Sequence, residues 1–280
     1  MSFVAAAFAL SAAGCWGAGD FSGGLATRRT DPFRSVLIIY SIGLVALVIV
    51  ALARGEALPP ASDIAWGALA GLFGMVGILL LFRGFAAGRM GIVAPVSGVL
   101  ATALPVIFNA FTLGLPREFQ LAGFAVAMLG IWLIARPEKF GRRPAGLGLA
   151  ILAGFCFGGF FITLDQVSKA SVFWPLVAGR AASVTAMLVF ALATRLPISL
   201  KQMPWGFFGL AGILDVAGNL FFLLAIQNGR LDVGAVLGSL YPAVTAMLAR
   251  FTIKEHITRL QLIGVTAALM AIVLITFPTG

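Results

Sequence analysis

Apolar residues occupy most of this chain in long runs that are separated by short polar connections. Most runs approach or exceed the roughly 18–20 residues with which an α-helix crosses about 30 Å of hydrocarbon. Transmembrane β-strands would instead alternate apolar and polar residues over about ten positions. The pattern therefore predicts an all-α integral membrane protein with ten transmembrane helices, at 2–25, 36–53, 64–82, 92–115, 119–135, 147–164, 173–193, 205–225, 233–249 and 260–277.

The composition excludes several classes of protein. Of the 280 residues, 61% are hydrophobic and only 10% are charged, whereas a soluble domain carries about 25% charged residues. Ten spans leave no room for a soluble nucleotide-binding domain, so an ATP-driven pump is not expected. The formal net charge of +9 is spread over many short connections, which favours lipid headgroups and not nucleic acid as its partner.

The basic residues are distributed unevenly between the two sides of the predicted membrane. Connections after even-numbered spans hold Arg54, Arg117, Lys169 and Arg230, and Arg180 lies within the seventh span. By the positive-inside rule, the connections after odd-numbered spans face the cytoplasm and both termini face outward. Those connections hold the other 14 of the 19 basic residues (19 less these five): Arg28, Arg29, Arg34, Arg83, Arg89, Arg136, Lys139, Arg142, Arg143, Arg195, Lys201, Arg250, Lys254 and Arg259.

The two halves of the sequence match each other when the chain is shifted by 141 residues without a gap. The shift places the only two cysteines on each other and QLAG at 120–123 on QLIG at 261–264. Chance alignment of Gly- and Ala-rich helices is the alternative, but one offset holds from the first span to the last. Five spans per repeat is an odd number, which inverts the second copy in the membrane. We therefore expect two inverted five-helix repeats, at 1–137 and 138–280.

The glycine-rich sequence GCWGAGDFSGG near the start resembles two other kinds of site. Gly17 and Gly19 fit the dinucleotide fingerprint G-x-G-x-x-G, but Ser22 stands in the third glycine position and no strand precedes it. A lipoprotein cleavage site at Cys15 would need a positively charged n-region, which the sequence lacks. The sequence also contains no catalytic triad, metal-ligand cluster or phosphate loop, so we expect no enzyme activity, cofactor or metal.

Ionisable side chains within the spans are costly to bury, which makes them candidate functional residues. Asp215 lies near the middle of the eighth span, and Asn219 follows one turn later on the same face. That face suits an ammonium group or a proton, and a buried polar pair that fixes the helix is the alternative. In the first span Asp20 shares a face with Trp16, where hydration or a salt bridge at the helix end is the alternative.

The second repeat carries further candidates. Phe157, Phe161 and Asp165 lie on one face of the sixth span, and Tyr241 offers a hydroxyl group in the ninth. We expect the aromatic rings to surround a substrate and Asp165 to serve in ion coupling or in a structural salt bridge. Arg180 either pairs with an acid or binds a substrate carboxylate.

Three prolines within the spans are candidate hinges: Pro95, Pro105 and Pro242. Each leaves a backbone carbonyl without its usual N–H partner. Such irregular helices line cavities or bend in transporters, and packing alone is the alternative.

Several short motifs lie along the chain: Trp16-Gly17, Arg180, AIQNG at 225–229, SLYPA at 239–243, Glu255 and QLIG at 261–264. Together they resemble the drug/metabolite transporter superfamily, in its EamA-type branch. The resemblance covers nearly the whole chain and implies a carrier for amino acids, metabolites or cationic drugs that works by alternating access. Members of the superfamily often have cytoplasmic termini, whereas the charge distribution here predicts outward termini.

We therefore predict a secondary-active transporter in a bacterial inner (plasma) membrane. It would export or exchange amino acids or similar small metabolites through a site at the midplane between the repeats. The expected partners are a small-molecule substrate, the lipid bilayer and protons as the candidate coupling ion. The alternatives are a passive, uncoupled facilitator of metabolites or an exporter of cationic drugs. A non-transporting membrane scaffold or an intramembrane enzyme is more remote.

Overall fold

The structure is a computed structural model, and it describes residues 3–113, 118–135, 145–168, 171–196, 203–228, 237–254 and 258–276. Within these ranges the chain is helical and contains no strand. Glu255, which contributes to the family resemblance, lies outside them. The helices are α1 (Phe3–Thr27), α2 (Pro32–Arg54), α3 (Ala61–Ala87), α4 (Met90–Leu113), α5 (Glu118–Ala135), α6 (Leu147–Leu164), α7 (Phe173–Ala193), α8 (Trp205–Asn228), α10 (Tyr241–Thr252) and α11 (Arg259–Thr276).

The helices agree closely with the apolar runs of the sequence. The sixth and seventh predicted spans coincide with α6 and α7, whereas α10 begins eight residues later than the span predicted at 233–249. Six of the described helices, α1, α2, α3, α6, α7 and α8, are long and apolar enough to cross a membrane. Shorter apolar stretches lie in α4, α5 and α11. The protein is therefore an all-helical, multi-pass membrane protein, and the count of ten crossings stays a prediction.

Short polar signals begin and end the helices. Asp31 caps α2, because its Oδ1 accepts the N–H of Phe33 at 2.9 Å. Pro32 occupies the first turn, where a missing N–H costs nothing. At the other end Gly55 adopts φ +61°, and its N–H donates to the carbonyl of Leu52 at 3.1 Å. These caps reverse the chain within a few residues, so that consecutive long helices can pack antiparallel.

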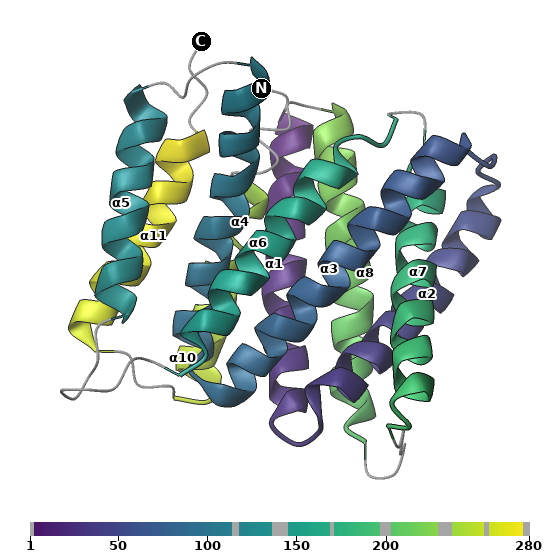
Figure 1. Ribbon diagram of the computed structural model, residues 1–280, viewed down its shortest axis with the longest axis horizontal. Coiled ribbons are helices and arrows are strands. Elements are labelled where there is room, and N and C mark those ends of the chain that lie inside the picture. The colour runs from purple at the N-terminus through teal and green to yellow at the C-terminus, as the bar shows by residue number, and fades with distance from the viewer. Residues whose placement is uncertain are drawn as a thin grey trace.

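The helices form one bundle with a paired edge on each side (Figure 1). At one edge α5 packs against α11, and at the other α2 packs against α7. Between the edges, α3 and α6 contact each other and cross in front of α1 and α8, which also form a contacting pair. α1 begins and α11 ends at the same end of the bundle.

Three of the contacts between helices of different halves are matched by a second contact when the two halves of the chain are exchanged. If α1, α2, α3 and α4 correspond to α6, α7, α8 and α10, the α1–α8 contact becomes α6–α3, which is also observed. In the same way α4–α6 becomes α10–α1, and α3–α7 becomes α8–α2. Each of these pairs joins a helix of the first half to a helix of the second. Each half therefore packs several of its helices against helices of the other half.

Glycines allow α3 and α7 to approach each other backbone to backbone. A Cβ atom added at Gly67 would collide with the backbone of Pro175, and one added at Gly71 would collide with that of Gly179. Ser183 Oγ donates to the carbonyl of Gly71 at 2.8 Å across the same crossing. Such close contact compensates for the missing hydrophobic driving force between helices in lipid. The crossing joins α7, at the edge of the bundle, to α3 in its middle.

Candidate functional site

A cavity lies between the two halves of the chain, where α1, α2 and α3 face α6, α7, α8 and α10. The centres of water molecules could occupy about 70 Å³ of it, which is room for several waters or for a small organic molecule. Its lining is mainly apolar and includes a few polar groups, as in most small-molecule sites. The lining residues are Trp16, Asp20, Tyr40, Gly67, Ala70, Gly71, Gly74, Ile78, Phe157, Phe160, Phe161, Leu164, Pro175, Leu176, Gly179, Arg180, Asp215, Asn219 and Tyr241.

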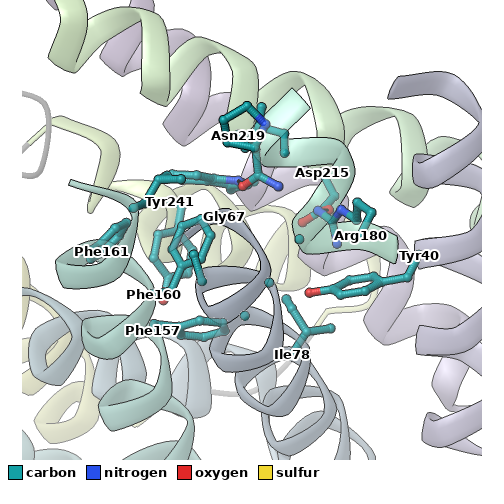
Figure 2. A pocket seen from close by; sticks show the side chains of 18 of the residues that line it. Tyr40, Gly67, Ile78, Phe157, Phe160, Phe161, Arg180, Asp215, Asn219 and Tyr241 are labelled. Carbon is teal, nitrogen blue, oxygen red and sulfur yellow. Dashed lines mark hydrogen bonds and ion pairs between the residues drawn. The ribbon is translucent and has the colours of Figure 1, made fainter. Parts of the chain in front are cut away.

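Aromatic rings form one side of the cavity (Figure 2). The centroid of the Trp16 ring lies 6.2 Å from that of Phe161 and 6.4 Å from that of Tyr241, which meets it edge-on. The Phe157 and Tyr241 rings meet edge-on at 6.5 Å. Phe222 supports the group from behind, at 5.3 Å from Trp16. Tilted and edge-on pairs at these separations are favourable for aromatic quadrupoles, so the wall is rigid as well as apolar.

One hydrogen bond fixes the orientation of Trp16. Its Nε1–H donates to Oδ1 of Asn219 at 3.1 Å, and this bond joins α1 to α8. Gly218 makes the approach possible, because a Cβ atom there would overlap the indole ring. Asn219 itself is buried. The predicted face of α8, with Asp215 and Asn219, thus lines the cavity. The amide oxygen of Asn219 accepts the hydrogen bond of Trp16.

A buried ion pair lies on the opposite side of the cavity. The guanidinium Nη2 of Arg180 donates to Oδ2 of Asp215 and joins α7 to α8. Their side chains are 7% and 17% exposed. The Arg180 guanidinium also lies 3.9 Å above the centroid of the Tyr40 ring, a cation–π contact that Figure 2 shows together with the ion pair. Of the two roles considered for Arg180, the structure shows pairing with an acid.

Asp20 is the second acid in the cavity, and its environment differs. Asp20 lies within α1, and only 7% of its surface is exposed. No hydrogen bond or ion pair to its carboxyl group is found among the described residues, where Arg180 is already paired with Asp215. The residue lines the same cavity as Tyr40 and Tyr241. Asp20 therefore leaves the cavity with an uncompensated negative charge when it is ionised.

Tyr241 and the proline after it connect α10 to the first half of the chain. The Tyr241 hydroxyl lies 3.4 Å from Ser97 Oγ of α4. Pro242 occupies the first turn of α10 and packs against Gly98. Thr245 Oγ1 donates to the carbonyl of Gly17 at 3.0 Å. These contacts hold Tyr241 at the meeting point of α1, α4 and α10.

A polar cluster joins the halves at one end of the cavity. Glu56, between α2 and α3, accepts the backbone N–H groups of Val172 at 2.7 Å and Phe173 at 2.8 Å. It also accepts the hydroxyl of Ser171 at 3.1 Å. In return, Trp174 Nε1–H donates to the Glu56 carbonyl at 2.8 Å. A carboxylate at the N-terminus of a helix satisfies free N–H groups and interacts favourably with the helix dipole.

Asp63 extends this cluster. Its carboxylate accepts the N–H of Ser168 at 3.2 Å and the hydroxyl at 2.5 Å. We call Glu56, Asp63 and the segment 168, 171–173 that they bind the clasp. The clasp adjoins the cavity, because Pro175 and Leu176, which line it, follow in the first turn of α7.

The other sequence candidates lie away from the cavity lining. Asp165 follows the last residue of α6 and is exposed. Pro95 and Pro105 both lie inside α4, which continues through them. Sequence reasoning missed Tyr40, although it is one of only two tyrosines in the chain and lies within an apolar run. It also missed Glu56, whose role depends on a segment more than a hundred residues away.

Comparisons with known proteins agree with this architecture. The profile of the EamA-like transporter family matches residues 3–136 and again residues 144–277. An uncharacterized protein of Methanocaldococcus jannaschii is 25% identical over 130 residues, which are 46% of this chain and 93% of that protein. A crystal structure of another protein, 17% identical, superimposes with a TM-score of 0.67 and covers 98% of this chain and 96% of its own. At that identity the structure supports the fold alone.

Proposed function

Since this chain belongs to the EamA-like transporter family, we propose that it is a secondary-active transporter of amino acids or similar small metabolites. The substrate would bind in the central cavity, near the midplane of the membrane, and the two halves would rock around it in alternating access. We place the protein in a bacterial inner membrane. No step of this cycle uses a cofactor.

The cavity is the observation that carries the proposal. Both halves of the chain contribute to it, with Trp16, Asp20 and Tyr40 from the first and Arg180 and Asp215 from the second. A site shared in this way changes its exposure whenever the halves move relative to each other. The mixture of aromatic rings with a few charged groups suits a small amphiphilic metabolite.

Three observations support two inverted five-helix repeats. The starts of the two matched segments, residues 3 and 144, are 141 residues apart, which is the offset that aligns the halves of the sequence. The relative from Methanocaldococcus jannaschii is matched over nearly its whole length by less than half of this chain. Three contacts between helices of different halves also have a counterpart when the halves are exchanged. Repeat boundaries near 1–137 and 138–280 remain our proposal.

We propose Asp20 as the proton-coupling residue in place of Asp215, whose face the sequence suggested for an ammonium group or a proton. Asp215 is engaged by Arg180, so a proton on it would have to break a buried ion pair. Asp20 is buried without such a partner in the described part of the chain. Binding of a proton there would remove an uncompensated charge from an apolar site.

Counterflow in proteoliposomes tests the function. Vesicles preloaded with one compound of a panel of amino acids, nucleosides, sugars and organic amines should accumulate the labelled form of the transported one. Uptake should exceed that of protein-free vesicles several-fold and should fall to background in a Trp16→Ala, Asn219→Ala double variant that still purifies as a folded protein. Absence of counterflow for the whole panel would contradict transport by this cavity.

An imposed pH gradient separates active transport from passive facilitation. If protons are coupled, initial rates should change with the direction of the gradient, and Asp20→Asn should abolish that change while leaving exchange measurable. Equal rates with and without the gradient would instead indicate an uncoupled facilitator.

A further inference from the structure

We propose that the cavity selects small amines, and that Asp20 is the residue that recognises their ammonium group. This inference concerns the substrate class of the proposed transporter and therefore depends on the same cavity. It narrows the substrate to metabolites that carry one net positive charge on an apolar body, and it disfavours zwitterionic amino acids.

The charge balance of the cavity is the first step. Among the described lining residues, the groups that carry full charges are Asp20, Asp215 and Arg180. Arg180 and Asp215 neutralise each other in a buried ion pair. When Asp20 is ionised, its carboxylate gives the site a net charge of minus one. Because the surroundings are apolar, a ligand with one positive charge restores neutrality at the lowest electrostatic cost.

The aromatic wall is the second step. Asp20 follows Trp16 by one turn on the same face of α1. The rings of Trp16, Phe157, Phe161 and Tyr241 all line the same cavity. A positive ammonium group is attracted to the faces of such rings, and aromatic residues with a nearby carboxylate are a common recognition site for ammonium ligands. The apolar part of the same ligand would pack against the remaining aromatic rings.

The engaged state of Arg180 is the third step. A zwitterionic amino acid would need a partner for its carboxylate, and Arg180 is the only guanidinium among the described lining residues. It already pairs with Asp215 and covers the Tyr40 ring. A substrate carboxylate would have to displace Asp215 and leave that acid buried without a partner, which is strongly unfavourable. The cavity therefore discriminates against carboxylates.

A set of ligands with one aromatic body and different charges tests the inference. Benzyltrimethylammonium and phenethylamine are cations, phenylalanine is a zwitterion, and 3-phenylpropionate is an anion. We expect the purified protein, in isothermal titration calorimetry, to bind both cations at least about tenfold more tightly than the other two. Equal affinities across the set, or preference for phenylalanine, would overturn the proposal.

Variants then identify the residue responsible. Asp20→Asn should weaken benzyltrimethylammonium binding about tenfold or more, because the amide keeps the shape of the carboxyl but not its charge. Glu118→Gln is the matched control: it removes the same charge from an exposed position at the start of α5 and should bind normally. Cation binding that is equal in the two variants would overturn the assignment of Asp20.

Two measurements keep the outcome clear. If Asp20→Asn does not fold, the ligand series on the unmodified protein still decides between cations and carboxylates. The result is also separable from the proposed function. Counterflow of sugars or nucleosides without any binding of amines would refute this inference and leave transport intact. Amine binding without counterflow of any compound would refute transport and leave the site intact.

Discussion

The carboxylate of Glu56 lies at the first turn of α7, where it accepts the backbone N–H of Phe173 at 2.8 Å. The two residues belong to different halves of the chain and are 117 positions apart. This contact is a helix cap supplied from a distance, because the sequence places Val172, which has no side-chain acceptor, immediately before α7. The start of α7 therefore depends on the α2–α3 connection.

Replacement of Glu56 should lower the stability of the folded protein. Glu56→Gln removes the charge and one of the two acceptor oxygens, and we expect a loss of about 1–2 kcal/mol in unfolding free energy. Thermal unfolding in detergent measures the effect as a lower transition temperature. Glu118→Gln removes an exposed carboxylate from the first turn of α5 and should lose less, about 0.3–1 kcal/mol. If the two variants unfold at the same temperature, the clasp does not stabilise the fold.

A methyl group at the α3–α7 crossing should be poorly tolerated. In Gly71→Ala the new Cβ would collide with the backbone of Gly179, and the resulting separation of the helices should cost about 1–3 kcal/mol. Gly209→Ala is the matched control in α8, because no atom lies within 4 Å of its added Cβ. That variant should be neutral or slightly stabilising. Comparable unfolding of the two variants would show that the crossing can relax without cost.

The ion pair of Arg180 and Asp215 should show strong coupling in a double-mutant cycle. Arg180→Leu or Asp215→Leu alone leaves a charge buried without its partner, and each should lower stability by about 3–5 kcal/mol. The double variant should recover much of that loss, because neither charge remains. Thermal or denaturant unfolding of the four proteins measures the coupling. Additive losses would indicate that each group acts independently.

Loss of the Trp16 donor should affect function more than packing. Trp16→Phe keeps an aromatic ring in the wall but removes the Nε1–H that donates to Asn219. The amide oxygen loses its partner at a cost of about 1–3 kcal/mol, and Asn219 becomes free to rotate. We expect a several-fold increase in the substrate concentration needed for half-maximal counterflow, with the same amount of protein in the vesicles. Unchanged transport would show that the hydrogen bond between Trp16 and Asn219 does not contribute to substrate binding.

Labelling of single cysteines tests the predicted orientation. Cys15 and Cys156 are first replaced by alanine, and one cysteine is then introduced in the basic segment 136–143. The charge distribution predicts a cytoplasmic location, so a membrane-impermeant maleimide should label it only after the cells are opened. A cysteine at Ala57, which is exposed in the α2–α3 connection, should instead react from outside intact cells. The reverse labelling pattern would show that the protein has the opposite orientation in the membrane.

The apolar pattern predicts most of the helices because lipid requires each crossing segment to satisfy its own backbone hydrogen bonds. The bounds of α6 and α7 coincide with their apolar runs for this reason. The start of α10 at Tyr241 is less visible, since the apolar pattern continues upstream of it through 233–240. A proline in the first turn is the local signal that could have placed it.

Contacts between helices are harder to predict than the helices themselves. Asp215, Arg180 and Asp20 were each recognisable as costly charges in an apolar run. Their sequence positions do not show that Arg180 reaches Asp215 and leaves Asp20 alone, because that choice depends on how α1, α7 and α8 are placed around the cavity. Asp165 belongs to the same face of α6 as Phe161, but the helix ends before it. The periodic pattern alone does not show at which residue the helix ends and the side chains become exposed.

The clasp has no counterpart when the halves of the sequence are exchanged, since the 141-residue shift places Glu56 on Pro197 and Asp63 on Pro204. Proline offers neither a carboxylate nor an N–H group. For a carrier with two conformations, contacts present in only one of them set the unliganded ratio of the two. Without substrate, the protein would then be predominantly in the conformation that is closed on the clasp side. A few hydrogen bonds would therefore determine the side of the membrane from which the substrate binds.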